Sequence, residues 1–160
     1  MTGVQTCALP ISPLNLEYFP LSPLIQEIAE LSSAEMDKRG IRYSFSNEAE
    51  DDRVLGERSQ IRQVLLNLGL NAMDAMPQGG TLSVRLYAEG GQIRIELKDT
   101  GCGIPPNLLS TIHMPFISTK KNGLGLGLSK AYAIIEEHGG SISCSSTVGE
   151  GTVFTVCLNR

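Results

Sequence analysis

The chain has 160 residues, of which 41% are hydrophobic and 19% charged, with a formal net charge of −4 and a pI near 5.2. This length and composition fit one globular domain with a buried core. The acidic balance argues against a general nucleic-acid or acidic-membrane binder, and no apolar run approaches the ~18 residues that a membrane-spanning helix needs.

The first residues differ from the rest of the chain. Met1 to Ile11 read M-T-G-V-Q-T-C-A-L-P-I and lack both the basic start and the long apolar stretch of a signal peptide. They resemble the conceptual translation of a common short-read sequencing adapter. We therefore interpret residues 1–12 as an artefact or a disordered arm and residues 13–160 as one domain, and we expect the natural protein to continue upstream.

The cysteines give no sign of a metal or disulfide framework. Cys7, Cys102, Cys144 and Cys157 include no C-x-x-C pair and no histidine at zinc spacing. We expect reduced thiols in a cytoplasmic domain, whose full-length protein could still be anchored in a membrane through upstream segments.

From residue 14 onward, the hydrophobic pattern alternates between helical and strand periods. In the first helix, Leu24, Ile28, Ala29 and Leu31 form the predicted apolar stripe. In chain order we predict a weak edge strand at 14–19, a helix from 22 to about 40, a strand at 41–46, a short strand at 54–55, a helix over 61–76, a hairpin of strands at 81–87 and 92–98, a loop at 100–122, a helix from 127 or 128 to 137, and a final hairpin at 141–146 and 152–158. This order predicts an α+β fold, a two-layer sandwich of one mixed, mostly antiparallel sheet covered on one face by three helices.

The end of the second hairpin strand carries the first candidate site. Asp99 to Ile104 read D-T-G-C-G-I, and Gly101 and Gly103 permit positive φ and a close approach of backbone to a flat ligand. A buried carboxylate that accepts from an exocyclic amine would select adenine over guanine. Taken alone, an ordinary tight turn explains the same letters better.

The second helix carries polar side chains beside its apolar stripe. Asn67, Asn71 and Asp74 fall at intervals of four and three on one face. A phosphate-bound Mg²⁺ takes a few oxygen ligands from protein, and the neutral amide of Asn71 could supply one. The alternative is a solvated helix face, although asparagine is a mediocre helix former.

A glycine-rich loop precedes the third helix. Gly123 to Ser129 read G-L-G-L-G-L-S, and backbone N–H groups at a helix N-terminus bind anionic phosphates. No G-K-[ST] follows, so this is not a Walker A loop, and no strand directly precedes it, so it is not a Rossmann turn. Lys120, just before the loop, could reach a terminal phosphate, or it is a solvated lysine.

In this order and spacing, the three motifs and Gly149-Glu150-Gly151-Thr152 resemble the ATP-binding motifs of the gyrase, Hsp90, histidine kinase and MutL superfamily, the Bergerat fold. The closest resemblance is to the ATP-binding catalytic domain of a bacterial two-component sensor histidine kinase. The wording N-A-M-D-A-M-P-x-G-G and H-G-G-x-I is similar to the nitrogen-regulation-type branch.

The resemblance implies ATP and Mg²⁺ as cofactors and assigns roles to individual residues. Asp99 would bond the adenine amine, with Thr152 sharing a water, and Asn71 would be the metal ligand. Asn67 would touch phosphate or metal-bound water, and Phe116 would anchor a lid. The implied cofactor-binding set is Asn67, Asn71, Asp74, Asp99, Gly101, Gly103, Ile104, Phe116, Lys120, Gly123, Leu124, Gly125, Leu126, Gly127, Leu128 and Thr152.

The resemblance also implies transfer of the γ-phosphoryl group to a histidine on an upstream dimerisation and histidine phosphotransfer domain, with a response regulator receiver domain as a further partner. No residue of this chain is assigned as a covalent catalyst. Gyrase-type relatives carry a glutamate base where this chain has Asn67, which favours transfer over hydrolysis. Neither His113 nor His138 begins a phosphoacceptor motif.

The expected fragment is a monomer from a homodimeric protein and binds no nucleic acid. Two other functions remain open. One is a stand-alone superfamily ATPase or anti-sigma-factor serine kinase, and the other is a non-catalytic docking domain.

Overall fold

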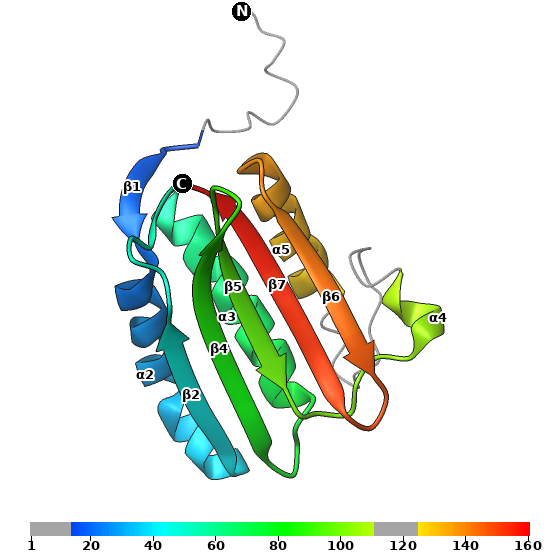
Figure 1. Ribbon diagram of the computed structural model, residues 1–160. Coiled ribbons are helices and arrows are strands. Elements are labelled where there is room, and N and C mark those ends of the chain that lie inside the picture. Colours follow the sequence, from blue (N-terminus) through cyan, green and yellow to red (C-terminus); the bar gives the residue numbers. More distant parts are fainter. Residues whose placement is uncertain (1–13, 111–124) are drawn as a thin grey trace, which may run out of the picture.

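The central element of the molecule is a five-stranded sheet. The computed structural model describes residues 14–110 and 125–160, and the strand order is β2-β4-β5-β7-β6 (Figure 1). Only β2 and β4 are parallel, so the predicted mixed, mostly antiparallel sheet is confirmed. The strands span Ile41–Asn47 (β2), Gly80–Glu89 (β4), Gln92–Asp99 (β5), Ser141–Thr147 (β6) and Gly151–Asn159 (β7).

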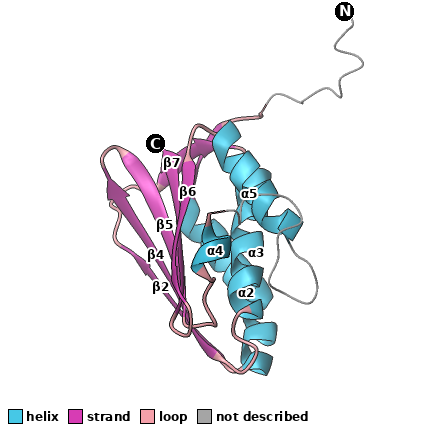
Figure 2. Cartoon of the chain, turned by 90° about the vertical axis from the view of Figure 1, so that its right-hand side faces the viewer, coloured by secondary structure: helices cyan, strands magenta, loops and turns pink. Residues whose placement is uncertain are grey.

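Three long helices cover one face of this sheet, as predicted (Figure 2). They are α2 (Leu21–Arg39), α3 (Arg58–Asp74) and α5 (Gly125–Glu137), and a short helix, α4 (Pro106–Leu109), follows the turn after β5. The opposite face of the sheet carries exposed polar side chains such as Arg42, Ser44 and Lys98 and has no covering layer among the described residues. Within this described part, no helix has the length and apolar character that crossing a bilayer requires.

Side chains aligned across neighbouring strands form successive rows on the helix-covered face of the sheet. Strand pairing aligns Leu86, Ile95 and Val156 in one row, and the next row on the same face is Val84, Leu97 and Phe154. All six side chains are buried against the helices. The following row is Leu82, Asp99 and Thr152, so a buried polar pair takes core positions where the sheet meets the C-terminal end of α3.

Helix α2 buries a stripe that overlaps the predicted one only in part, at Leu24. Its buried residues are Leu21, Leu24, Ile25 and Met36. Leu31 is 64% exposed, so its predicted core position is wrong. At 100° per residue Leu31 falls at the margin of the buried stripe, where neither α3 nor the sheet reaches it.

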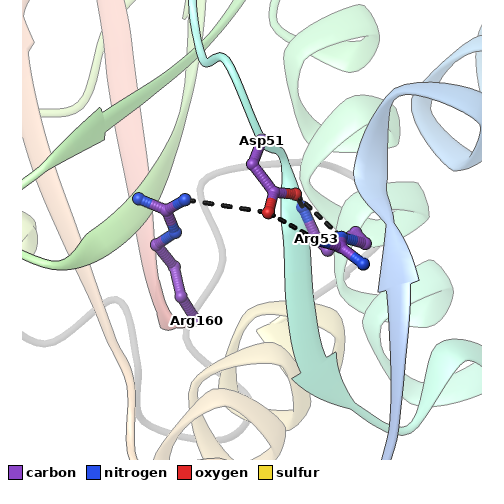
Figure 3. Close-up of polar contacts among 3 residues, drawn as sticks. All are labelled: Asp51, Arg53 and Arg160. Carbon is purple, nitrogen blue, oxygen red and sulfur yellow. Dashed lines mark hydrogen bonds and ion pairs between the residues drawn. The ribbon is translucent and has the colours of Figure 1, made fainter.

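A second, two-stranded sheet stands at the start of the domain. The short strands β1 (Glu17–Pro20) and β3 (Arg53–Gly56) pair antiparallel, which the sequence did not predict. Asp51 lies just before β3, and its carboxylate pairs with Arg53 at 2.8 Å and with Arg160 at 3.9 Å (Figure 3). This ionic cluster joins the end of β7 to the segment that leads into α3.

Candidate functional site

Three segments far apart in the sequence meet at the C-terminal end of α3. The N–H of Cys102, in the turn after β5, donates to the carbonyl of Ala75 at 3.1 Å. On its other side the same turn contacts the β6–β7 hairpin, where Gly149 N–H donates to Cys102 O at 2.9 Å. The predicted residues Asn71, Asp99 and Thr152 belong to these three segments.

Asp99 is a fixed, buried carboxylate. Its side chain belongs to a residue that is 5% exposed, and Oδ1 accepts the N–H of Gly101 at 2.8 Å. Its negative charge also acts on Cys144, whose thiol pKa is raised to about 12, first by burial and then by Asp99. A carboxylate held this way offers an acceptor of defined direction to a ligand with a polar N–H.

Thr152 sits opposite Asp99 in the strand register and is 4% exposed. Its Oγ1 lies 2.8 Å from Ser146 Oγ, which also lies 3.0 Å from the carbonyl of Gly151. If Ser146 donates to that carbonyl, Thr152 donates to Ser146, and Thr152 Oγ1 keeps acceptor capacity.

Ser146 was not predicted from the sequence. Its Oγ accepts the N–H of Ile104 at 2.7 Å, so one hydroxyl joins the turn after β5 to the final hairpin. The signal that could have found it is the hairpin register, which pairs Ser146 with Thr152.

Gly101 and Gly103, in the turn after β5, are required because neighbouring backbone leaves no room for a Cβ atom. The sequence alone instead indicates positive φ and close approach of a ligand as the reasons. Gly103 does have a positive φ of 78°, but a Cβ there would lie 2.4 Å from the carbonyl oxygen of Thr147. Gly101 does not have a positive φ, and its Cβ would meet the carbonyl oxygen of Ala75 at 2.5 Å. Both glycines therefore allow the turn to contact neighbouring backbone, and their contact with a ligand remains a prediction.

The polar residues of α3 occupy three different environments. Asn71 is 9% exposed. Asn67 is half-buried; its Nδ2 donates to the carbonyl of Gly127 at 3.1 Å, and its Oδ1 accepts from Gln63 at 2.9 Å. Asp74 forms an ion pair with Arg39 of α2 at 3.0 Å, so part of its role is to join two helices.

The remaining predicted residues lie in or near the glycine-rich segment. Gly127 is half-buried next to Asn67, and Leu128 packs against the main core. Gly125 and Leu126 lie in the first turn of α5, which begins two or three residues earlier than predicted. Phe116, Lys120, Gly123, Leu124 and His113 lie outside the described residues.

His138 is held at both ring nitrogens. Its Nδ1 lies 2.7 Å from the carbonyl of Ile134, and its Nε2 accepts the N–H of Glu57 at 3.1 Å. This geometry requires the tautomer with the proton on Nδ1. A phosphoacceptor needs an accessible ring nitrogen, so the arrangement agrees with a structural role for His138.

The described residues fit a purine nucleotide with a phosphate-bound cation. Asp99 provides a buried acceptor for an exocyclic amine, and Asn71 provides an amide on the adjacent helix end. No group of three or more His, Cys, Asp or Glu side chains within residues 14–110 and 125–160 could hold a metal ion. A cation bound there would rely on few protein ligands and on the phosphates, as Mg²⁺ does in phosphoryl-transfer sites.

Comparison with known proteins agrees with this arrangement. Residues 56–160 match the family model described as histidine kinase-, DNA gyrase B-, and HSP90-like ATPase. The chain belongs to this ATPase family. The matched residues include the whole of α3, the turn after β5, α5 and the final hairpin, which carry the candidate site residues of this ATPase domain.

The curated relatives of the ATPase domain include sporulation kinases and sensor histidine kinases. It is 36% identical to sporulation kinase A of Bacillus subtilis over 144 residues, which is 90% of this chain and 24% of that protein. It is also 36% identical to the sensor histidine kinase ZraS of Escherichia coli K12 over 145 residues, or 91% of this chain and 31% of that protein. The chain thus spans about a quarter to a third of the length of these relatives.

Solved structures give the same result. The nucleotide-free catalytic domain of histidine kinase ThkA superposes with a TM-score of 0.84 at 34% identity, covering 91% of this chain and 96% of that one. Full-length ShkA in complex with AMPPNP superposes with a TM-score of 0.85 at 26% identity, covering 94% of this chain and 32% of that one. The ATPase domain is therefore of the histidine kinase type, as the motifs predicted. Its place in the nitrogen-regulation-type branch stays a prediction.

Proposed function

We propose that this domain binds Mg-ATP and presents the γ-phosphoryl group to a histidine of an upstream dimerisation and phosphotransfer domain. The observation that carries the proposal is the buried Asp99–Thr152 pair at a core position of a histidine kinase-type ATPase fold. A buried carboxylate on the core face of the sheet is costly unless a ligand or neighbouring group uses it.

Asp99 would read the base. With Oδ1 accepting the Gly101 N–H, the carboxylate is oriented to accept a second N–H, and the adenine amine is such a donor. Guanine presents a carbonyl at the equivalent position, so a carboxylate there would face an acceptor. ATP should therefore bind about 100-fold or more tightly than GTP.

Asn71 and the start of α5 would hold the phosphates. Asn71 would supply an oxygen ligand to Mg²⁺, which neutralises phosphate charge when bound. The N-terminus of the 13-residue helix α5 provides N–H groups and partial positive charge for phosphate oxygens. Asn67, bonded to Gly127 O, would fix the start of that helix against α3.

Transfer to a protein acceptor is favoured over hydrolysis by Asn67. Its amide cannot take a proton from water, and both ends of the amide already have hydrogen-bond partners. In such transfer the protein chiefly positions the reactants and stabilises charge.

The partners and the cellular location follow from the same proposal. ThkA has been solved in complex with the response regulator protein TrrA, and its catalytic region superposes on this chain with a TM-score of 0.79 at 32% identity. We infer a receiver domain as the second partner here, after the upstream phosphoacceptor helices. The domain would act in the cytoplasm, where ATP is available.

Calorimetric titration with Mg-ATP and Mg-GTP tests the proposal. Asp99→Asn and Asn71→Ala should each weaken ATP binding at least about tenfold, because each removes a strong ligand contact. Asp51→Asn is the matched control, since it makes the same chemical change at the exposed ionic cluster. Equal ATP and GTP affinity, or a wild-type titration for Asp99→Asn, would contradict the assignment.

The same titration decides between the proposed kinase domain and a non-catalytic docking domain, which would bind no ATP. Phosphate release from ATP by the isolated chain decides the other alternative. A stand-alone ATPase would turn over ATP without any partner, whereas the proposed domain should not.

A further inference from the structure

The hydroxyl of Ser146 holds the turn after β5 against the start of β7. Ser146 is a half-buried residue of β6 that pairs in register with Thr152 of β7. Its Oγ accepts the N–H of Ile104 at 2.7 Å, and it lies 3.0 Å from the carbonyl oxygen of Gly151 and 2.8 Å from Thr152 Oγ1. A serine hydroxyl has one proton and two lone pairs, so these three contacts use it completely.

The same three contacts fix the direction of each proton. The N–H of Ile104 takes one lone pair of Ser146. A carbonyl oxygen can only accept, so the proton of Ser146 goes to Gly151. The second lone pair of Ser146 then accepts the proton of Thr152. With its proton directed at β6, Thr152 Oγ1 offers only lone pairs to any other group.

Thr152 lies beside the carboxylate that is proposed to read the base. Asp99 and Thr152 are directly opposite in the antiparallel register of β5 and β7, where Cβ atoms lie about 5 Å apart, and both residues are buried. An ionised carboxylate only accepts, and Asp99 already accepts the N–H of Gly101 through Oδ1. The pair thus presents two neighbouring acceptors, and a ligand group or water that bonds either of them has to donate.

We propose that Ser146 is a positioning residue for base selection: by accepting the proton of Thr152, it makes Asp99 and Thr152 an acceptor-only pair that rejects guanine. The exocyclic amine of adenine can donate to this pair, whereas the guanine carbonyl at the equivalent position would face two acceptors. Without the Ser146 hydroxyl, the Thr152 hydroxyl can turn its proton toward that carbonyl. The inference rests on the proposed function, and Ser146 acts through Thr152 rather than on the nucleotide itself.

Calorimetric titration of variants with Mg-ATP and Mg-GTP tests the proposal. Ser146→Ala should weaken ATP binding and reduce the ATP-to-GTP affinity ratio about tenfold, because Thr152 can then donate to guanine. Ser146→Thr keeps a hydroxyl and should keep the wild-type ratio. Ser145→Ala is the matched control, since it makes the same chemical change one residue away on the exposed side of β6. A purely structural role for Ser146 would lower both affinities together and leave their ratio unchanged, which would contradict the proposal.

A double-mutant cycle shows whether Ser146 acts through Thr152. Thr152→Val removes the hydroxyl while keeping a branched side chain, and it should reduce the affinity ratio by itself. Adding Ser146→Ala to Thr152→Val should not change the ratio further. Thr152→Val also decides the question if Ser146→Ala does not fold, because it removes the group that Ser146 orients.

The titrations separate this inference from the proposed function. A wild-type chain without a preference for ATP would contradict the proposed function itself. A wild-type preference for ATP that persists unchanged in folded Ser146→Ala, or in Thr152→Val, would overturn the role of Ser146 and leave the proposed function standing.

Discussion

At the residue scale, Gly101 and Gly69 differ in the space that is available for an added side chain. A Cβ at Gly101 would have backbone and side-chain atoms of Ala75 within 2.5 to 2.9 Å, whereas a Cβ at Gly69 would have nothing within 4 Å. The first glycine is fixed by its contact with the end of α3, and the second is not. The two positions therefore make a matched pair for substitution.

Gly101→Ala should destabilise the domain by about 1–3 kcal/mol, because the contacted atoms belong mainly to backbone and cannot rotate away. It should also weaken ATP binding, since the N–H of residue 101 orients Asp99. Thermal unfolding and nucleotide titration measure the two effects. A fully stable Gly101→Ala variant would mean that the turn can move without affecting α3.

Gly69→Ala should instead stabilise the domain by about 0.5–1 kcal/mol. The alanine improves helix propensity, and its methyl group enters open space. Denaturant unfolding measures this change, and ATP affinity should not fall. Destabilisation would show that the space beside α3 is smaller than the structure indicates.

At the scale of elements, side chains tie α3 and α5 together at two points. Asn67 of α3 bonds the carbonyl of Gly127 near the start of α5, and His138, just after α5, accepts the N–H of Glu57 just before α3. The helices carry the two halves of the proposed phosphate site. These two hydrogen bonds thus hold α5 against α3 near both ends of α5.

His138→Ala should destabilise the domain by about 1–2 kcal/mol, because the Glu57 N–H at the start of α3 loses its acceptor. Chemical denaturation measures the change. Glu136→Ala, at an exposed position near the end of α5, is the control and should stay within measurement error. Equal stability of the two variants would argue against a stabilising role for the hydrogen bond between His138 and Glu57.

At the scale of the whole molecule, four carboxylates that pair with arginines share a response to acid. The pKa values of Glu27, Glu35, Glu48 and Asp51 are all lowered, mainly by hydrogen bonds from the side chains of their arginine partners. A lowered folded-state pKa contributes stability that is present above the unfolded pKa and lost as the pH falls through the folded value.

The stability of the domain should therefore be constant from about pH 5 to 7 and fall below about pH 4. Because these pairs are exposed, salt should reduce their share of the loss, and Asp51→Asn alone should change the melting temperature very little. Melting temperatures across pH at low and high salt check this. A large effect of Asp51→Asn would show that the cluster in Figure 3 is more than a surface ion pair.

The isolated chain should bind ATP but not label itself. Transfer needs an imidazole nitrogen in line with the γ-phosphate, and both nitrogens of His138 are engaged elsewhere. Incubation with labelled ATP and Mg²⁺ should leave the chain unlabelled and monomeric, and adding a matching phosphoacceptor helix pair should produce acid-labile label on that pair. Robust labelling of the chain that is lost in His113→Ala or His138→Ala would contradict this.

Much of this architecture could be predicted because local patterns decide it. The alternation in 81–87 and 92–98 and the Glu89-Gly90-Gly91 turn fix a hairpin, and the structure has β4 and β5 there. Strand order then places Asp99 beside Thr152, which the motifs had linked.

Features that depend on distant partners could not be predicted. The pairing of β1 with β3 leaves no local pattern, and the four-residue helix α4 is too short for periodicity. Arg39 meets Asp74 only because α2 packs beside α3. Phe116, the predicted lid anchor, and Gly123, the first glycine of the loop, lie outside the described part, so their assignments rest on the sequence alone.

The position of the last strand has a consequence for how the site comes into being during synthesis. β7 is the final element along the chain, yet it lies inside the sheet, between β5 and β6. A nascent chain that has reached only β6 leaves β5 with an open edge and Asp99 without its neighbour Thr152. The proposed nucleotide site is therefore incomplete until β7 is made, and a premature stop before Gly151 would remove Thr152 and the closure of the sheet together.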